Sequence, residues 1–163
     1  MKTLLIVWHS RTGGSRAMAE AAAQAARDAG EVEVRLQRAS EAQPDDLLAA
    51  DGYLFAFPEN LAAISGEMKE FFDRSYYAVL ERLNGRAYGL MVCAGSDGEN
   101  AVRQAARIAT GWRLKPAAEP IIVCTHAQTP AAIAAAKTIG PEDLARCAEL
   151  GAAIAAGLAL GIF

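Results

Sequence analysis

The first sixteen residues constrain the fold more than any other part of the chain. An unbroken apolar or β-branched run over residues 3–8 predicts a strand buried on both faces, as in the middle of a parallel sheet. A polar loop rich in Ser, Thr and Gly follows, and a long helical pattern begins at Arg16. A strand, a small-residue loop and a helix aim several backbone N–H groups and the positive end of a helix dipole at one point. The stretch therefore predicts a site for a phosphate group.

The residues of this loop narrow the kind of phosphate ligand. The Gly-x-x-x-x-Gly-Lys motif of nucleotide P-loops and the Gly-x-Gly-x-x-Gly dinucleotide motif are both absent. Hydroxyls and backbone amides are the donors instead, and neutral donors can satisfy a terminal phosphomonoester without Mg²⁺. A Gly-Ser turn that binds nothing is the alternative reading. The candidate binding residues here are Ser10, Arg11, Thr12, Gly13, Gly14 and Ser15.

The rest of the chain alternates between predicted strands and predicted helices. This alternation predicts an α/β fold, with a parallel sheet and helices on both of its faces. The second strand alternates apolar and polar residues, which places it at an edge and favours the five-strand order 2-1-3-4-5. Residues 1–163 are expected to form a single domain. Strands are predicted over residues 3–8, 31–37, 52–57, 87–93 and 121–124, and helices over 15–29, 44–50, 67–83, 99–110, 129–138 and 142–158.

Three loops that are far apart in sequence are expected to meet at one crevice. In open parallel sheets, ligands bind beyond the carboxyl ends of the strands, near the point where the strand order reverses. The first loop is the predicted phosphate loop, and the other two follow the third and fourth predicted strands. Their candidate residues are Pro58, Glu59, Asn60, Leu61 and Ala62 in the second loop, and Cys93, Ala94, Gly95, Ser96, Asp97 and Gly98 in the third.

Taken in order, the three loops resemble segments of the flavodoxin superfamily. Residues 10–15 are similar to its Ser-x-Thr-Gly-x-Ser/Thr loop, which holds the phosphate of flavin mononucleotide (FMN). Residues 58–74 resemble the segment that runs under the isoalloxazine ring in NAD(P)H-dependent FMN reductases and NAD(P)H:quinone oxidoreductases, including the tryptophan-repressor-binding-protein family. Residues 93–98 stand where a Ser-Thr-Gly-x-x-Gly segment closes over the other end of the ring. The resemblance implies a flavodoxin-like three-layer αβα sandwich that binds FMN.

The same resemblance implies an FMN-dependent oxidoreductase. NADPH or NADH would reduce the flavin, and a quinone or another small acceptor would then take the electrons. The cofactor carries such chemistry, so no catalytic side chain is expected. This agrees with a sequence that shows no Ser/His/Asp, Cys/His or metal-binding constellation.

A flavodoxin-type FMN electron carrier is the alternative function. Such carriers usually stack aromatic side chains on both faces of the ring and are strongly acidic. Residues 58–66 and 94–100 contain no Phe, Tyr or Trp, and the net charge is only −3. A receiver domain of the same topology would need acidic residues where His9, Ser10 and Pro58 stand. A further alternative that the sequence leaves open is a flavodoxin-like domain that no longer binds flavin.

The composition of the chain limits the cellular compartments and the kinds of partner that can be expected. The chain has no basic patch, so nucleic acid is not expected as a partner. Three widely spaced cysteines (Cys93, Cys124 and Cys147) form neither a disulfide framework nor a zinc motif and suit a reducing compartment. The first residues do not read as a signal peptide, and the apolar stretch over residues 151–163 is too short to span a bilayer. We therefore expect a cytoplasmic protein without membrane contact, and leave open whether it is a homodimer or a homotetramer.

Overall fold

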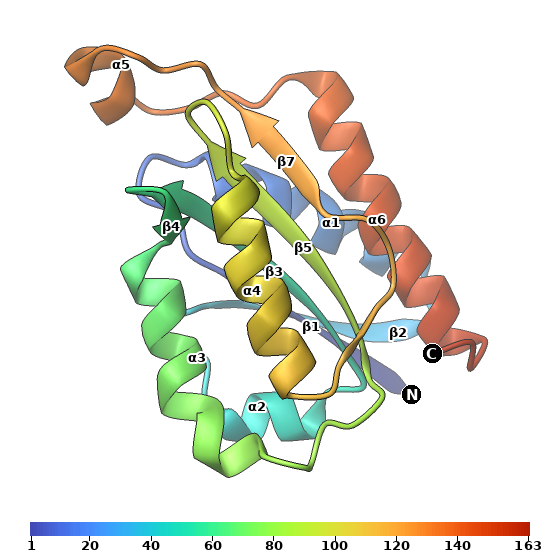
Figure 1. The fold of residues 1–163 in the computed structure, drawn as a ribbon. Coiled ribbons are helices and arrows are strands. Elements are labelled where there is room, and N and C mark those ends of the chain that lie inside the picture. Colours follow the sequence, from blue (N-terminus) through green and yellow to red (C-terminus); the bar gives the residue numbers. More distant parts are fainter.

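A parallel sheet runs through the centre of the computed structural model, which describes residues 1–163 (Figure 1). The strands lie in the order β2-β1-β3-β5, and β6 and β7 both pair in parallel with the outer edge of β5. The half-exposed β2 is at the edge, as its alternating pattern predicts. The strands are β1 (Lys2–Trp8), β2 (Val32–Arg38), β3 (Gly52–Asn60), β5 (Ala87–Ala94), β6 (Lys115–Pro116) and β7 (Ile121–Cys124).

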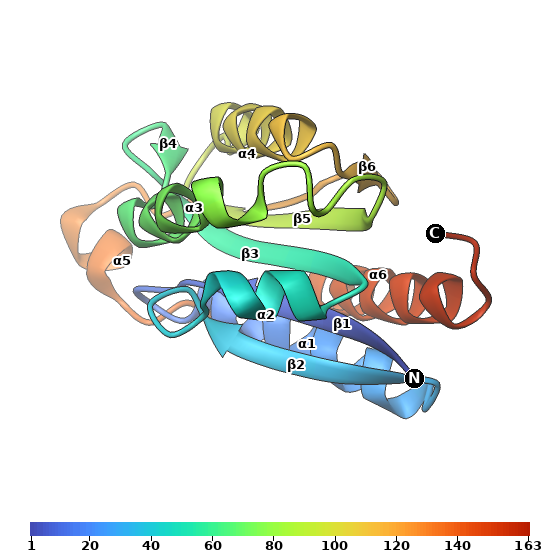
Figure 2. The same ribbon diagram turned by 90° about the horizontal axis from the view of Figure 1, so that it is seen from below.

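Successive side chains of each strand enter two separate cores, one on each face of the sheet. Leu5 and Val7 of β1 belong to one core, whereas Leu4 and Ile6 belong to the other. The first core is covered by α2 (Pro44–Ala49), α3 (Gly66–Val79) and α4 (Glu99–Gly111). The second is covered by α1 (Gly14–Asp28) and α6 (Pro141–Ala159), so the molecule is the predicted αβα sandwich (Figure 2).

The sheet differs from the predicted one in its number of strands. The expected fifth strand over residues 121–124 is β7, and β6 is an additional two-residue strand that lies outside the predicted ones. The two do not join into one longer strand, because Pro116 and Pro120 lack the N–H group that a continuous ladder needs. A further short strand, β4 (Ala63–Ile64), lies within residues 60–66, which we expected to be loop. It pairs antiparallel with the end of β3, opposite Glu59 and Asn60.

Two predicted helices are shorter in the structure than the sequence suggests. The helix expected over 67–83 is α3, which ends at Val79 because Leu80 is extended and Glu81 takes a left-handed conformation with φ 59°. The helix expected over 129–138 is reduced to α5 (Pro130–Ala134), and Ala135 is extended. The other helical bounds agree with the predictions to within a residue or two.

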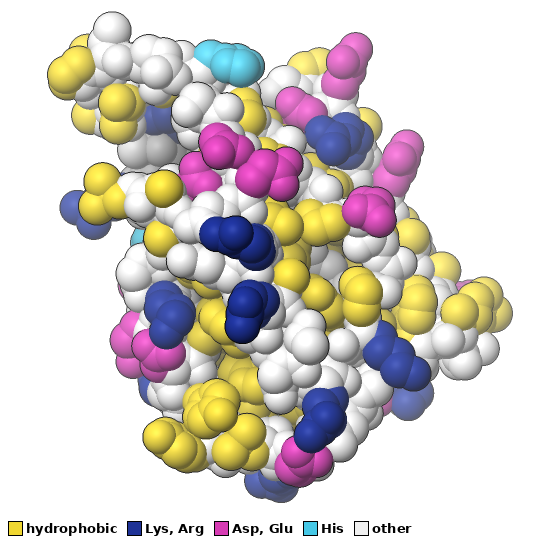
Figure 3. Space-filling model, viewed as in Figure 1, with side chains coloured by type: hydrophobic (Ala, Val, Ile, Leu, Met, Phe, Trp, Pro, Cys, Tyr) yellow, Lys and Arg dark blue, Asp and Glu magenta, His cyan; other side chains and the backbone are white.

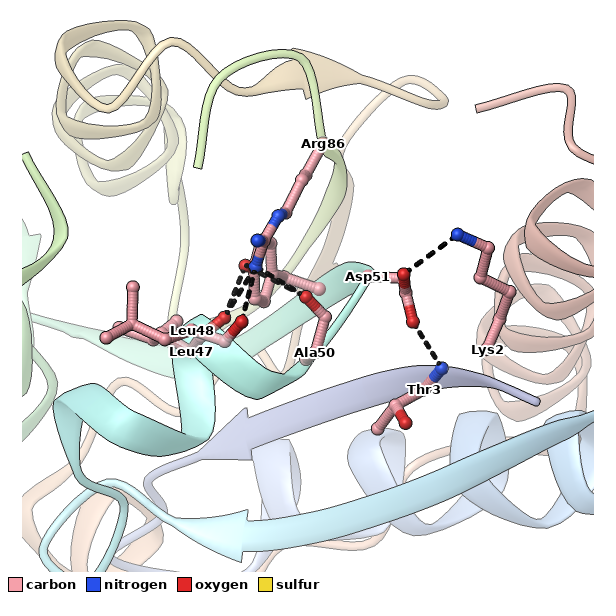
Figure 4. Close-up of polar contacts among 8 residues, drawn as sticks. Lys2, Thr3, Leu47, Leu48, Ala50, Asp51 and Arg86 are labelled. Carbon is pink, nitrogen blue, oxygen red and sulfur yellow. Dashed lines mark hydrogen bonds and ion pairs between the residues drawn. The ribbon is translucent and has the colours of Figure 1, made fainter. Parts of the chain in front are cut away.

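Arg86 fastens the amino-terminal end of the sheet to α2 (Figure 4). Its Nη1 atom donates to the carbonyl oxygens of Leu47, Leu48 and Ala50 at 3.0, 3.0 and 2.6 Å, and it lies 3.0 Å from the Tyr53 hydroxyl. A cation is favourable at the carboxyl end of a helix, where carbonyl groups lack partners. The positive charge of Arg86 therefore stabilises the carboxyl end of α2.

Asp51 binds the first residues of β1 at the same end of the sheet (Figure 4). Its carboxylate accepts hydrogen bonds from the Lys2 ammonium at 3.0 Å and from the Thr3 backbone N–H at 2.8 Å. Burial opposes ionisation of this carboxyl group, but these two donors outweigh it and lower its pKa. Both termini also lie at this end of the molecule (Figure 1), so the opposite end carries the loops expected to form the site.

The apolar face of α3 points at the sheet, but its two tyrosines do not. Phe71 and Phe72 are buried among the aromatic side chains of the first core, and Phe72 packs edge-on against Phe55 and Trp112. Tyr76 follows Phe72 by four residues, so helical spacing puts it on the same side of α3, yet it is 45% exposed. An apolar cluster is visible on the surface at the carboxyl end of α3 (Figure 3), where Tyr76 and Tyr77 lie. No helix has both the length and the apolar character needed to cross a membrane.

The packing of α3 predicts a large stability difference between two of its aromatic residues. Phe72 is 3% exposed. The Phe72→Ala substitution should therefore lower the free energy of unfolding by roughly 3–5 kcal/mol, because a cavity replaces the buried ring. Tyr77→Ala is the matched control, since Tyr77 is 83% exposed and its loss should cost less than about 0.5 kcal/mol. Urea denaturation of the two variants makes the comparison. Equal midpoints would show that the buried face of α3 is assigned wrongly.

Candidate functional site

A cleft of about 840 Å³ is lined by residues at the carboxyl ends of β1, β3 and β5. This end of the sheet lies opposite the two termini (Figure 1). A second cavity, beside Met1 and Asp51, has a volume of only about 450 Å³. All three predicted loops contribute to the larger cleft, together with a segment near α5 that sequence reasoning did not include. Its lining residues are Ser10, Arg11, Thr12, Gly14, Ser15, Pro58, Glu59, Asn60, Leu61, Cys93, Gly95, Ala127, Ile133 and Ala134.

The first loop presents backbone donors at the start of α1. Gly13 takes φ 98°, which only glycine adopts readily, and its N–H group donates to Ser10 Oγ at 2.9 Å. The N–H groups of Gly14, Ser15 and Arg16 have no acceptor within the protein. The first turn of α1 contains no acidic side chain that could serve instead. Three free donors at the positive end of a 15-residue helix suit a phosphate group.

The second loop is a tight hairpin held in a strained conformation. Leu61 and Ala62 join β3 to β4 and have φ values of 51° and 61°. A two-residue turn with both φ values positive usually contains Asn-Gly, because other side chains are strained there. Leu61 stands at the tip with its side chain fully exposed. The strain therefore lies at the mouth of the cleft.

Side chains of α4 hold this hairpin in place. Asn100 Nδ2 donates to the Ala62 carbonyl oxygen, and Gln104 Oε1 accepts from the Ile64 backbone N–H at 3.0 Å. Glu59 ties the hairpin to the third loop, because its Oε1 atom accepts from the Gly98 N–H at 3.0 Å. These contacts fix the second and third loops relative to each other.

The other oxygen of the Glu59 carboxyl group has no partner. Glu59 Oε2 is buried and accepts no hydrogen bond, although Glu59 lines the cleft. A buried acceptor without a donor is costly, so this oxygen suits a ligand that brings a donor into the cleft. The imide N–H of an isoalloxazine ring is such a donor, and the free amides of α1 fit the phosphate of the same cofactor. The cleft therefore fits FMN at both ends.

Cys93 lies at the floor of the cleft, directly under the phosphate loop. A Cβ atom on Gly14 would lie 2.5 Å from Cys93 Sγ, so only glycine permits this approach of α1 to β5. Burial raises the pKa of the Cys93 thiol, and the opposing field of Lys137 does not cancel the effect. A protonated, buried thiol is a poor nucleophile. Cys93 thus shapes the site rather than reacting in it.

A further segment at the cleft, residues 125–140, includes α5 and was not among the predicted site residues; we call it the strap. Ala127, Ile133 and Ala134 of the strap line the cleft, and Lys137 reaches the phosphate loop. The Thr125 N–H donates to the Ala94 carbonyl at 2.9 Å, which joins the start of the strap to the third loop. The only available signal was weak: Lys137 is the sole Lys or Arg between Lys115 and Arg146.

The remaining predicted residues surround the cleft without lining its main volume. Gly13 and Gly98 are the N-cap residues of α1 and α4 and have φ values of 98° and 88°. Asp97 Oδ1 accepts from the Glu99 N–H at 3.2 Å in the first turn of α4. Ala94 lines a smaller pocket that adjoins the cleft, and the other residues outside its main lining are Ala62 and Ser96.

His9 links the phosphate loop to the second loop. Its Nε2 atom lies 2.7 Å from a carboxylate oxygen of Glu67, and its Nδ1 atom lies 2.8 Å from Ser65 Oγ. A carboxylate can only accept, so Nε2 carries the hydrogen and Nδ1 accepts from the buried Ser65 hydroxyl. Burial lowers the pKa of His9, with a smaller contribution from Arg11, while the charge of Glu67 opposes the shift. The neutral imidazole is thus the form that this network satisfies.

This network predicts a pH dependence of stability. The folded chain binds the His9 proton less readily than the unfolded chain, whose pKa is 6.5, so stability is present above pH 6.5 and falls as the pH drops below it. His9→Gln should therefore lose less stability than the wild type between pH 7.5 and about 5.5. His126→Gln, which removes an exposed histidine instead, is the control variant. The measurement is the urea midpoint of each protein across this pH range. If the midpoint of His9→Gln falls with pH as steeply as that of the wild type, the lowered pKa of His9 is assigned wrongly.

Comparison with known proteins agrees with this geometry. The family model of the NADPH-dependent FMN reductases matches residues 39–129, more than half of the chain. Over 97 residues the chain is 40% identical to a flavodoxin of Aquifex aeolicus (strain VF5), an alignment that covers 60% of this chain and 50% of that protein. It is 32% identical to an NAD(P)H dehydrogenase (quinone) of Acidithiobacillus ferrooxidans, over 46% of this chain and 48% of that protein. The matches thus span about half the length of both relatives.

A solved structure extends the similarity of fold to the whole chain. The flavodoxin, WrbA-like protein of Agrobacterium tumefaciens superposes with a TM-score of 0.73, covering 99% of each chain at 18% identity. At that identity the likeness concerns the fold, which is flavodoxin-like. Together with the family match, which includes the second and third loops, it supports one conclusion: the chain belongs to the NADPH-dependent FMN reductase family of flavodoxin-like proteins.

Proposed function

We propose that this protein uses FMN, bound in the 840 Å³ cleft, to pass electrons from NADPH or NADH to a quinone or another small acceptor. The observation that carries the proposal is the chemistry of the cleft wall. None of its fourteen lining residues is aromatic. A ring bound there would not be stacked between Trp or Tyr side chains, so one face stays accessible to a planar donor or acceptor.

In this proposal the residues of the chain bind and orient the cofactor. The free amides of Gly14, Ser15 and Arg16 hold the phosphate, and Glu59 Oε2 accepts the ring imide N–H. The aliphatic side chains of Leu61 and Ile133 flank the opening of the cleft from the hairpin and the strap. When bound, FMN supplies the redox chemistry, taking electrons from a nicotinamide and giving them to the acceptor. No side chain of the cleft needs to act as an acid or base.

The full set of seventeen predicted contact residues is part of the same proposal. Those that line the cleft would touch the cofactor, whereas Gly13, Gly98 and Asp97 would act by shaping the starts of α1 and α4. Residues 1–163 would act as one flavodoxin-like unit whose acceptor is a small molecule. The family match and the quinone-dehydrogenase relative support this reading.

A flavodoxin-type electron carrier is the second candidate function. The 40% identity to the flavodoxin of Aquifex aeolicus favours it. Against it stand the lack of aromatic residues in the cleft wall and a net charge of only −3. The two functions differ in whether a nicotinamide reduces the bound flavin directly or only through a partner reductase.

Direct reduction of the flavin therefore tests the proposal. NADPH or NADH added anaerobically to the FMN-loaded protein should bleach the visible flavin absorbance, and a small quinone should restore it. Leu61→Trp should slow this bleaching at least about tenfold by covering the ring with an aromatic side chain, whereas Leu61→Ala should not. A bound flavin that neither nicotinamide bleaches, but that a chemical reductant does, would assign the carrier function instead.

A further inference from the structure

Lys137 of the strap is anchored on the phosphate loop from a position 125 residues away in sequence. Its backbone N–H donates to the Thr12 carbonyl oxygen at 2.8 Å. Its side chain turns back to the same residue, with Nζ 3.3 Å from Thr12 Oγ1. Two independent contacts thus place the ammonium group beside the loop that offers free amides to a phosphate.

The positive charge of Lys137 is not neutralised within the protein. The ammonium group donates to the carbonyl oxygens of Ile133 and Ala135 at 2.7 and 2.6 Å, and Thr12 Oγ1 completes its three partners. All three partners are uncharged, and Lys137 takes part in none of the eight ion pairs. Lys137 has no carboxylate partner at ion-pair distance, so its positive charge is available to an anion bound in the cleft.

The Lys137 side chain also borders the edge of the cleft. Lys137 lines the smaller pocket that adjoins the cleft, together with Thr12, Glu59 and Cys93. The longest of its three contacts is the one to the Thr12 hydroxyl, and a phosphate oxygen held by the loop can take that place. Ammonium groups bind phosphate oxygens as point charges through such contacts.

We propose that Lys137 is the charge partner of the ligand's phosphate and makes the cleft select phosphorylated flavin over riboflavin. This inference rests on the proposed FMN site and adds its specificity-determining residue. The same contact joins the strap to the phosphate loop. A merely structural anchor would stabilise the strap equally with either ligand.

The test measures the dissociation constants of FMN and riboflavin by quenching of flavin fluorescence at several KCl concentrations. Lys137→Met should weaken FMN about 10- to 100-fold and riboflavin less than about twofold. It should also flatten the salt dependence of FMN binding, because screening acts on the lost charge pair. Lys137→Arg should restore most of the salt dependence, and Lys115→Met, at the other end of the sheet, should bind both ligands as the wild type does.

The outcomes separate this inference from the proposed function. A wild-type protein that binds FMN no better than riboflavin would overturn the phosphate site itself. A wild type that prefers FMN, with the preference unchanged in Lys137→Met, would overturn the role of Lys137 alone. An equal loss for both ligands in Lys137→Met would make Lys137 a structural anchor. If Lys137→Met unfolds, Lys137→Gln takes its place, because its neutral amide can still donate to Thr12 Oγ1. A reduced preference for FMN over riboflavin in Lys137→Gln supports the role of the charge, and an unchanged preference overturns it.

Discussion

The close approach of Gly14 to Cys93 sets the geometry on which the cleft depends. The first turn of α1 lies directly on β5 because Gly14 has no side chain and Gly13 turns the chain with φ 98°. This contact brings the amino end of a long helix over the carboxyl ends of β1 and β5, where three loops meet. The free amides, the buried Glu59 oxygen and the third loop then lie around one volume.

Strain in the backbone is gathered around the same volume. Five non-glycine residues have positive φ values, and three of them, Leu61, Ala62 and His126, lie in the hairpin or at the start of the strap. Each such residue costs on the order of 1–3 kcal/mol and persists only where its surroundings hold it. Asn100 and Gln104 of α4 hold the hairpin, and the His126 N–H donates to the Gly95 carbonyl at 2.8 Å. The walls of the cleft are thus fixed by contacts between loops.

The strands, their order and the three meeting loops could be predicted because they follow from local patterns. The apolar run before Trp8 and the alternation over 31–37 each describe the burial of one strand, and burial determines position in a parallel sheet. The hairpin could not be predicted, since Leu61-Ala62 lacks the Asn-Gly signal of its turn. Nor could periodicity separate Phe72 from Tyr76, because both lie on one side of α3 and only tertiary packing decides which is covered.

The strap shows how a tertiary contact overrides local preference. Residues 130–137 are rich in alanine and predict a longer helix, yet α5 ends at Ala134 and Ala135 is extended. The extended residue lets Lys137 meet Thr12 through both its backbone and its ammonium group. No local pattern records a contact across 125 residues, so this part of the candidate site could be found only from the structure.

If the proposed site is right, one cofactor contacts all three loops and the strap. The most direct measurement is a titration of ¹⁵N-labelled protein with FMN, followed by the backbone amide resonances. We expect shifts concentrated at Gly14–Arg16, Glu59–Ala62, Gly95–Gly98 and the strap near Lys137, with the largest at the free amides of α1. Shifts centred instead on the groove between α3 and α4, around Tyr76 and Arg107, or no shifts at all, would contradict it.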